Sequence, residues 1–98
     1  MNKTLSMIGL CQKAGKISSG EFSVETAIKA GHAHLVIIAD NASDNTKKKF
    51  TNMCNYRQIP YKIDFDKDEL GHAIGKQFRA TICVTDEQFA TSIEKTWR

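Results

Sequence analysis

The chain has 98 residues, of which 41% are hydrophobic and 26% are charged, so we expect one globular domain spanning residues 1–98 rather than a disordered tail or a coiled-coil rod. The longest apolar run, residues 35–39, is far shorter than the ~18 residues that a membrane span needs. The net charge is +3, and the whole excess lies in residues 1–49, which hold seven lysines against four acidic residues. A positive surface of this kind either attracts a polyanion such as nucleic acid or is an ordinary solvated face.

Hydrophobic periodicity predicts a regular alternation of helices and strands. The first half is expected to hold a helix over about residues 3–14, an extended piece at 16–19, a helix from 19–21 to Gly31 and a buried strand at 35–39. A helix over about 44–57, capped by Ser43, and an edge strand at 61–65, opened by Pro60, should follow. The last expected elements are a short helix capped by Asp66, a loop at 75–79, a strand at 80–85 and a helix carrying Phe89 and Trp97. Ser18 with Glu21, and Thr85 with Gln88, have the spacing of capping boxes. This alternation predicts an α/β fold, a three-layer α/β/α sandwich.

No cluster of residues indicates catalysis or a metal site. Cys11, Cys54 and Cys83 each fall on a predicted buried face, where cysteine acts as a small hydrophobe, and no CxxC pair indicates a disulfide or a zinc site. His32 and His34 form a pair without further ligands at metal-binding spacing. We therefore expect a reducing, cytoplasmic location and no catalytic residue, metal, cofactor or small-molecule substrate.

Cations cluster around the predicted start of the second helix. Lys13 and Lys16 lie just upstream of it, and Gly20 would let a phosphate or a base edge approach its free N–H groups. Residues 47–49 place three lysines at the start of the third helix, where cations oppose the helix dipole, although lysine is also abundant on ordinary surfaces. The loop at 75–79 adds Phe78, which would either cover an unpaired base or belong to the core.

The order of six motifs resembles a known family. Residues 33–43 read AHLVIIADNAS and residues 69–76 read ELGHAIGK. The other four motifs lie at residues 10–21, 45–49, 56–61 and 84–90. Together they resemble the bacterial YlxQ-type branch of the ribosomal-protein superfamily of kink-turn RNA binders, the L-seven-Ae and L-thirty-e type. The resemblance extends from about residue 5 to about residue 93.

The resemblance implies a four-stranded mixed sheet within the sandwich, the L-thirty-e-like fold. It also implies RNA binding, with the start of the second helix entering a widened groove at a kink in the RNA. A loop before the last strand would cover an extruded base. The implied partners are structured RNA, ribosomal or otherwise kink-turn-like, and the ribosome, with no membrane partner.

The residues at the second helix depart from those of the RNA-binding relatives, which have glycine, a free position, Asn or Lys, then Glu or Gln, and a lysine three residues later. Gly20 matches the glycine and Glu21 fills the free position. Phe22 and Ser23 stand where the base-reading side chains would be, and Thr26 stands where the lysine would be. Phe22 cannot form a hydrogen bond to a guanine edge, so we expect it to stack on a base instead.

The sequence therefore predicts a non-catalytic, ribosome-associated RNA-binding protein. The candidate RNA-binding residues are Lys13, Lys16, Gly20, Glu21, Phe22, Ser23, Thr26, Lys29, Asn45, Lys47, Lys48, Lys76, Phe78 and Arg79. Two alternatives stay open: a protein-interaction module that has lost kink-turn recognition, and an accessory domain that captures RNA for a methylating enzyme on another chain.

Overall fold

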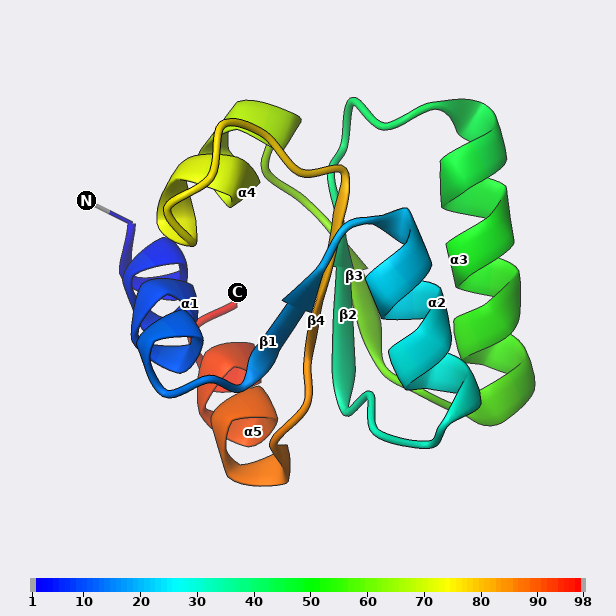
Figure 1. Ribbon diagram of the computed structural model, residues 1–98, viewed down its shortest axis with the longest axis horizontal. Coiled ribbons are helices and arrows are strands. Elements are labelled where there is room, and N and C mark those ends of the chain that lie inside the picture. The colour runs from blue at the N-terminus through cyan, green and yellow to red at the C-terminus, as the bar shows by residue number, and fades with distance from the viewer. Residues whose placement is uncertain (1, 98) are drawn as a thin grey trace.

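A computed structural model describes residues 2–97 and shows the expected alternation of helices and strands. The helices are α1 Lys3–Lys13, α2 Glu21–Lys29, α3 Asp44–Arg57, α4 Lys67–Ala73 and α5 Glu87–Lys95. The strands are β1 Ile17–Ser19, β2 Leu35–Ile38, β3 Tyr61–Ile63 and β4 Thr81–Val84. The predicted three-layer sandwich is confirmed: Figure 1 shows α1, α4 and α5 on one face of the sheet and α2 and α3 on the other.

The sheet is mixed and four-stranded, in the order β1-β4-β2-β3. Strand β4 pairs antiparallel with both β1 and β2, while β3 pairs parallel with β2. Every residue of β2 and β4 is buried, because these central strands are covered by helices on both faces. The predicted edge position of β3 is confirmed, and the strand is shorter than expected because the backbone turns at Phe65, whose φ is +62°.

The helix starts show where the local sequence decides the structure. Ser43 and Asp66 cap α3 and α4 as expected, and Asp66 forms a full capping box with Glu69. The two capping boxes expected elsewhere are wrong. Ser18 lies inside β1, so α2 starts at Gly20 without a side-chain cap, and α5 is capped by Asp86 rather than by Thr85.

Trp97 closes the layer formed by α1, α4 and α5. Its Nε1 donates a hydrogen bond of 2.8 Å to Oδ2 of Asp64, and its ring lies 5.7 Å from that of Phe65. The ammonium of Lys62 lies 5.9 Å from the same ring. The C-terminal end of α5 is thereby attached to the segment that joins β3 to α4.

Candidate nucleic-acid interface

The sheet register brings three helix starts to one edge of the molecule. The N–H of Gly20 donates to the carbonyl of Thr81 at 3.0 Å, and Thr81 is the register partner of Ile38. Ile38 is in turn paired with Ile63. The starts of α2, α3 and α4 follow β1, β2 and β3 directly, so all three lie at this edge, which is the upper edge in Figure 1. We call it the helix-start edge.

Among the helices of residues 2–97, α2 is the one that starts without a backbone N–H donating to a capping side chain. The first bond of its own backbone runs from Val24 N–H to the carbonyl of Gly20, so the N–H groups of Glu21, Phe22 and Ser23 precede it. Gly20 has φ +91° and ψ 155°, a region that only glycine adopts readily, and no atom beyond its two chain neighbours lies within 4 Å of the position a Cβ would occupy. The α2 start is therefore open to an anion.

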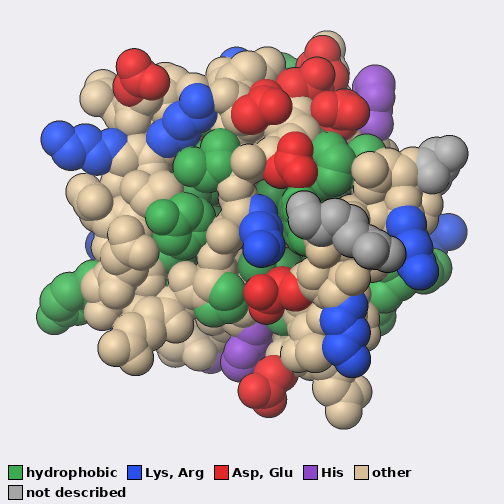
Figure 2. All heavy atoms as spheres, turned by 180° about the vertical axis from the view of Figure 1, so that it is seen from behind, with side chains coloured by type: hydrophobic (Ala, Val, Ile, Leu, Met, Phe, Trp, Pro, Cys, Tyr) green, Lys and Arg blue, Asp and Glu red, His purple; other side chains and the backbone are tan. Residues whose placement is uncertain are grey.

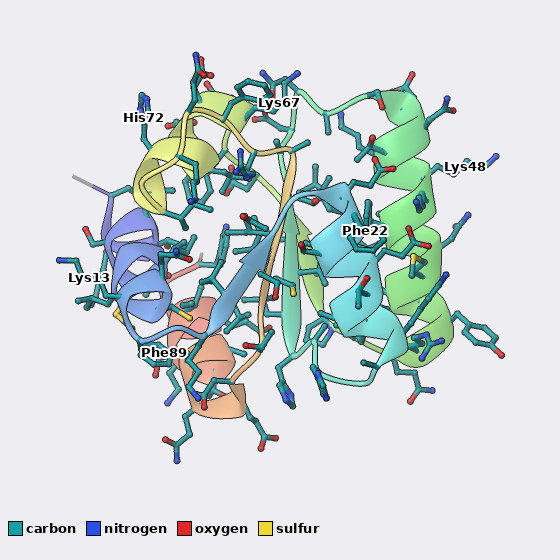
Figure 3. All side chains as sticks on the ribbon, in the orientation of Figure 1. Lys13, Phe22, Lys48, Lys67, His72 and Phe89 are labelled. Carbon is teal, nitrogen blue, oxygen red and sulfur yellow. The ribbon has the colours of Figure 1, made fainter. Side chains whose placement is uncertain are left out.

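Phe22 is the most exposed feature of that start. Its side chain is 82% exposed, and Figure 3 shows it on the outer side of the first turn of α2. Ser23 and Thr26 are also exposed, and the Thr26 hydroxyl donates to the Phe22 carbonyl at 2.9 Å. An aromatic ring this exposed gains little from the core, so its place on the surface suits a contact with a flat partner.

A chain of ion pairs joins α2 to α3. Lys49 lies 2.7 Å from Glu25 and 3.4 Å from Glu21, and Lys29 lies 2.9 Å from Glu25. The hydrogen bonds from Lys49 and Lys29 lower the pKa of Glu25 to about 2 from its ordinary 4.5. Because the folded-state pKa is depressed, the stabilisation is complete above pH 4.5 and is lost as the pH falls towards 2. Lys29 and Glu21, two of the candidate residues, are thus already paired.

The loop before β4 reaches the helix-start edge beside β1. Arg79 Nε donates to the Ser19 hydroxyl at 3.2 Å, and its Nη1 donates to the Phe78 carbonyl at 2.7 Å, which leaves the rest of the guanidinium for a partner. Phe78 is 52% exposed, so it is a surface residue rather than a core residue. The loop lies close against α4, because a Cβ on Gly71 would stand 2.4 Å from the Phe78 Cα. Lys76 is exposed in the same loop.

The α3 start contributes an exposed Asn45, a half-buried Lys47 and an exposed Lys48. Lys48 points outward from α3, away from α2 (Figure 3). Lys67, at the start of α4, was not among the candidates, although its carbonyl accepts the Arg79 N–H at 3.0 Å and its own N–H donates to Asn41 at 2.9 Å. The sequence did not indicate that Lys67 lies at the helix-start edge, because it stands in an acidic segment and its neighbours at this edge come from distant parts of the chain.

Lys13 and Lys16 do not join the helix-start edge. The Lys16 carbonyl accepts the Thr85 N–H at 2.9 Å, at the opposite end of β4 from Thr81. Four residues of extended chain from Lys16 to Gly20 correspond to about 13 Å. Figure 3 also shows Lys13 on the far side of the molecule from Lys48. The two lysines thus precede α2 closely in the sequence, but the strand between them and Gly20 carries them away from the α2 start, and both are exposed cations.

Charge on the opposite face does not favour a polyanion. Figure 2 shows most of the acidic side chains of that face near its upper edge, with basic side chains both beside and below them. The acidic residues of the α4 start, Asp66, Asp68 and Glu69, serve its cap and its dipole. These carboxylates therefore lie at the helix-start edge beside Lys67, on the α4 side of it.

The cysteines are structural, as expected. All three are buried, and burial raises the pKa of each of Cys11, Cys54 and Cys83 to about 11. At neutral pH they are thiols rather than nucleophilic thiolates. Within residues 2–97, no group of three or more His, Cys, Asp or Glu side chains is arranged to hold a metal ion.

Comparison with known proteins decides the family. The model of the Ribosomal protein L7Ae/L30e/S12e/Gadd45 family matches residues 2–94. The chain belongs to this family. A Bacillus subtilis relative, named RNA-binding protein YlxQ, is 41% identical over 89% of this chain and 87% of its own length. An Enterococcus faecium protein of the same name is 35% identical over 90% of this chain and 84% of its own length.

The fold of this chain also matches that of a solved structure. A protein of unknown function from Bacillus halodurans superposes with a TM-score of 0.95 at 36% identity, covering 98% of this chain and 97% of the other. The family description names ribosomal proteins, and both relatives are named RNA-binding proteins, which agrees with the expected non-catalytic protein. No helix within residues 2–97 has the length and apolar character needed to cross a lipid bilayer.

Proposed function

We propose that this protein is a non-catalytic, cytoplasmic RNA-binding domain that recognises kinked or otherwise irregular structured RNA at its helix-start edge. The observation that carries the proposal is the uncapped α2 start beside Arg79, in a chain that belongs to the L7Ae family. Open backbone N–H groups and a guanidinium both bind phosphate oxygens, and an adjacent exposed ring binds a base face. The name of the YlxQ relatives supports the same class of partner.

The finer part of the proposal is that the RNA contains a kink-turn and belongs to the ribosome. The family description names ribosomal proteins, which supports the second point. The α2 start lacks the usual base-reading side chains, so we propose that the kink is recognised by its shape, with Phe22 stacking and Lys47, Lys48, Lys67, Lys76 and Arg79 contacting phosphates.

A second candidate function is a protein-interaction module that has lost kink-turn recognition. Phe22, Ser23 and Thr26 favour it, because an exposed ring beside small hydroxyls also suits a protein partner. This alternative predicts that neutralising Arg79 and Lys67 changes no RNA affinity.

The first experiment is a titration with a kink-turn RNA and with a copy whose G·A pairs are changed to Watson–Crick pairs. We expect the kinked RNA to bind at least about tenfold more tightly, a difference of about 1.4 kcal/mol. Neutralising about four phosphates should give a slope near −3 to −4 in log affinity against log salt concentration. An affinity that does not change with salt would contradict the phosphate contacts, and equal binding of both RNAs would contradict kink recognition.

Replacing Glu25 with glutamine is expected to strengthen RNA binding by about twofold to fivefold at low salt. The change frees Lys29 for phosphate oxygens and leaves Lys49 with Glu21 as its remaining carboxylate partner. Glu87→Gln is the matched control, because it makes the same change in charge on the exposed start of α5. An equal gain from both variants would show that net charge alone is responsible.

A further inference from the structure

A hollow of about 360 Å³ lies beside the helix-start edge, between β1 and the outer face of α2. Ser18 lines it from β1, and Phe22, Thr26 and Ala30 line it from α2. Because Ala30 lies eight positions after Phe22, a rise of about 12 Å along a helix, the hollow follows most of the length of α2. Its volume lies at the lower end of the range for small-ligand sites.

The lining suits a flat, polar ring. Phe22 offers a nearly free aromatic face, being 82% exposed, and the small Ala27 and Ala30 side chains leave space beside it. The hydroxyls of Ser18 and Ser23 can both donate and accept hydrogen bonds, as base edges require. The Thr26 hydroxyl already donates to the Phe22 carbonyl, so it is available as an acceptor.

The β1 strand adds backbone groups to this site. It is an edge strand, and positions 16, 18 and 20 face β4. The Lys16 carbonyl and the Gly20 N–H bond to residues at the two ends of β4, and Ser18 is the register partner of Cys83 between them. Alternate residues of an antiparallel pair face the partner strand, so Ile17 and Ser19 direct their N–H and C=O groups outward. An extended chain laid along β1 would meet these groups.

A cation stands at each end of the same strand. Lys16 is exposed, takes part in none of the ion pairs within residues 2–97, and lies two residues before Ser18, about 6.6 Å along an extended chain. Arg79 is hydrogen-bonded to Ser19 at the other end. Arg79 reaches that end from the α4 side of the sheet, because its N–H bonds to the Lys67 carbonyl and the Ser19 side chain alternates with that of Ser18. The strand thus has a cation near each end at which the phosphates of a single-stranded segment can be held.

We infer that the hollow between β1 and α2 binds one unpaired nucleotide of the RNA partner. Its base stacks on Phe22 and meets Ser18 and Ser23, and its backbone follows β1 from Arg79 towards Lys16. This inference rests on the proposed RNA-binding function and adds a site for an unpaired base beside the helix start. It also assigns Lys16 a phosphate contact, although Lys16 lies too far from the helix-start edge to bind RNA there.

Continuity with the helix-start edge favours a nucleotide over a peptide. Phe22 and Ser23 belong both to the hollow and to the uncapped first turn of α2, so an RNA held at that turn passes directly over the hollow. The backbone of a peptide would bring neutral amides to Lys16 and Arg79, whereas a nucleotide brings phosphates that match both cations.

The test compares a hairpin RNA that carries a three-nucleotide bulge with the same hairpin lacking the bulge. We expect Phe22→Leu to weaken binding of the bulged RNA by about tenfold or more and to change binding of the paired RNA less than twofold. Phe22→Tyr keeps the stacking face and should retain the affinity. Tyr56→Leu is the matched control, because that ring is 84% exposed at the far end of α3 and should affect neither RNA.

Direct contact is tested by photo-crosslinking the wild-type protein to the bulged RNA with 5-iodouridine in the bulge. The inference predicts a cross-link within residues 16–32, lost in Phe22→Leu. A Phe22→Leu variant that binds the bulged RNA like the wild type would overturn the inference and the stacking role of Phe22, while leaving the phosphate contacts of the proposed function intact. An equal loss for both RNAs would overturn the inference alone. Failure of the wild type to bind either RNA would overturn both proposals.

Discussion

Replacing Gly71 with alanine is expected to lower the free energy of unfolding by about 1–3 kcal/mol, despite the better helix propensity of alanine. The new Cβ would stand 2.4 Å from the Cα of Phe78, 2.7 Å from its N and 2.9 Å from the carbonyl carbon of Gln77. All three are backbone atoms, so the loop before β4 must move as a unit. Phe78 and Arg79 would then leave the helix-start edge, and RNA affinity should fall with the stability.

Chemical and thermal unfolding measure the first effect, with a fall in Tm of roughly 4–8 °C for each kcal/mol in a domain of this size. His72→Ala is the matched control, because His72 is the next residue of α4 and is exposed. It should leave Tm within about 2 °C of the wild type. If the Gly71→Ala protein is as stable as the wild type, the loop before β4 can move without loss of stability, and its position is not fixed by α4.

The layers of the fold could be predicted from the sequence because burial leaves a strong pattern. Apolar residues without alternation mark β2, and the alternation after Pro60 marks β3 as an edge strand. The order in which the strands pair is not a local property, since it depends on which connections cross the sheet. The mixed sheet was expected from the resemblance to the family, because hydrophobic periodicity does not show which strands pair or in which direction.

The helix caps were harder to predict, because one residue can serve two elements. Ser18 has the right spacing from Glu21 for a capping box, but it is paired with Cys83 in β1. In α5 the side chain of Asp86 accepts the Phe89 N–H, one residue later than the expected Thr85. A strand that must reach its partner thus overrides a local capping signal.

The candidate site was predicted in part for a similar reason. Sequence proximity placed Lys16 beside Gly20, and three residues of β1 carry it to the other end of the strand. Conversely, Lys49 meets Glu21 although 28 positions separate them, so the sequence could not show that Glu21 is paired. Charges that look adjacent along a strand are separated in space, while helix packing joins charges that are far apart in the chain.

Replacing Gly20 with alanine is expected to cost about 1–3 kcal/mol of stability and to weaken RNA binding by about tenfold or more. With φ +91° and ψ 155°, Gly20 holds a backbone conformation that an L side chain adopts only under strain. Relief of that strain would rotate the Gly20 peptide, whose N–H bonds to Thr81 and whose carbonyl starts α2 by accepting the Val24 N–H. The open N–H groups of the first turn would then point away from the phosphate they are proposed to bind.

Gly31→Ala separates the two effects. Gly31 follows the other end of α2, has φ +79° and likewise has no atom within 4 Å of a Cβ position. Its replacement should cost about 1–2 kcal/mol through the left-handed conformation alone. Gly31 lies away from the helix-start edge. The RNA affinity of the Gly31→Ala protein, measured well below its Tm, should therefore equal that of the wild type. If both glycine variants lose RNA affinity equally, the loss reflects destabilisation of α2, and the backbone at Gly20 does not form part of the RNA-binding surface.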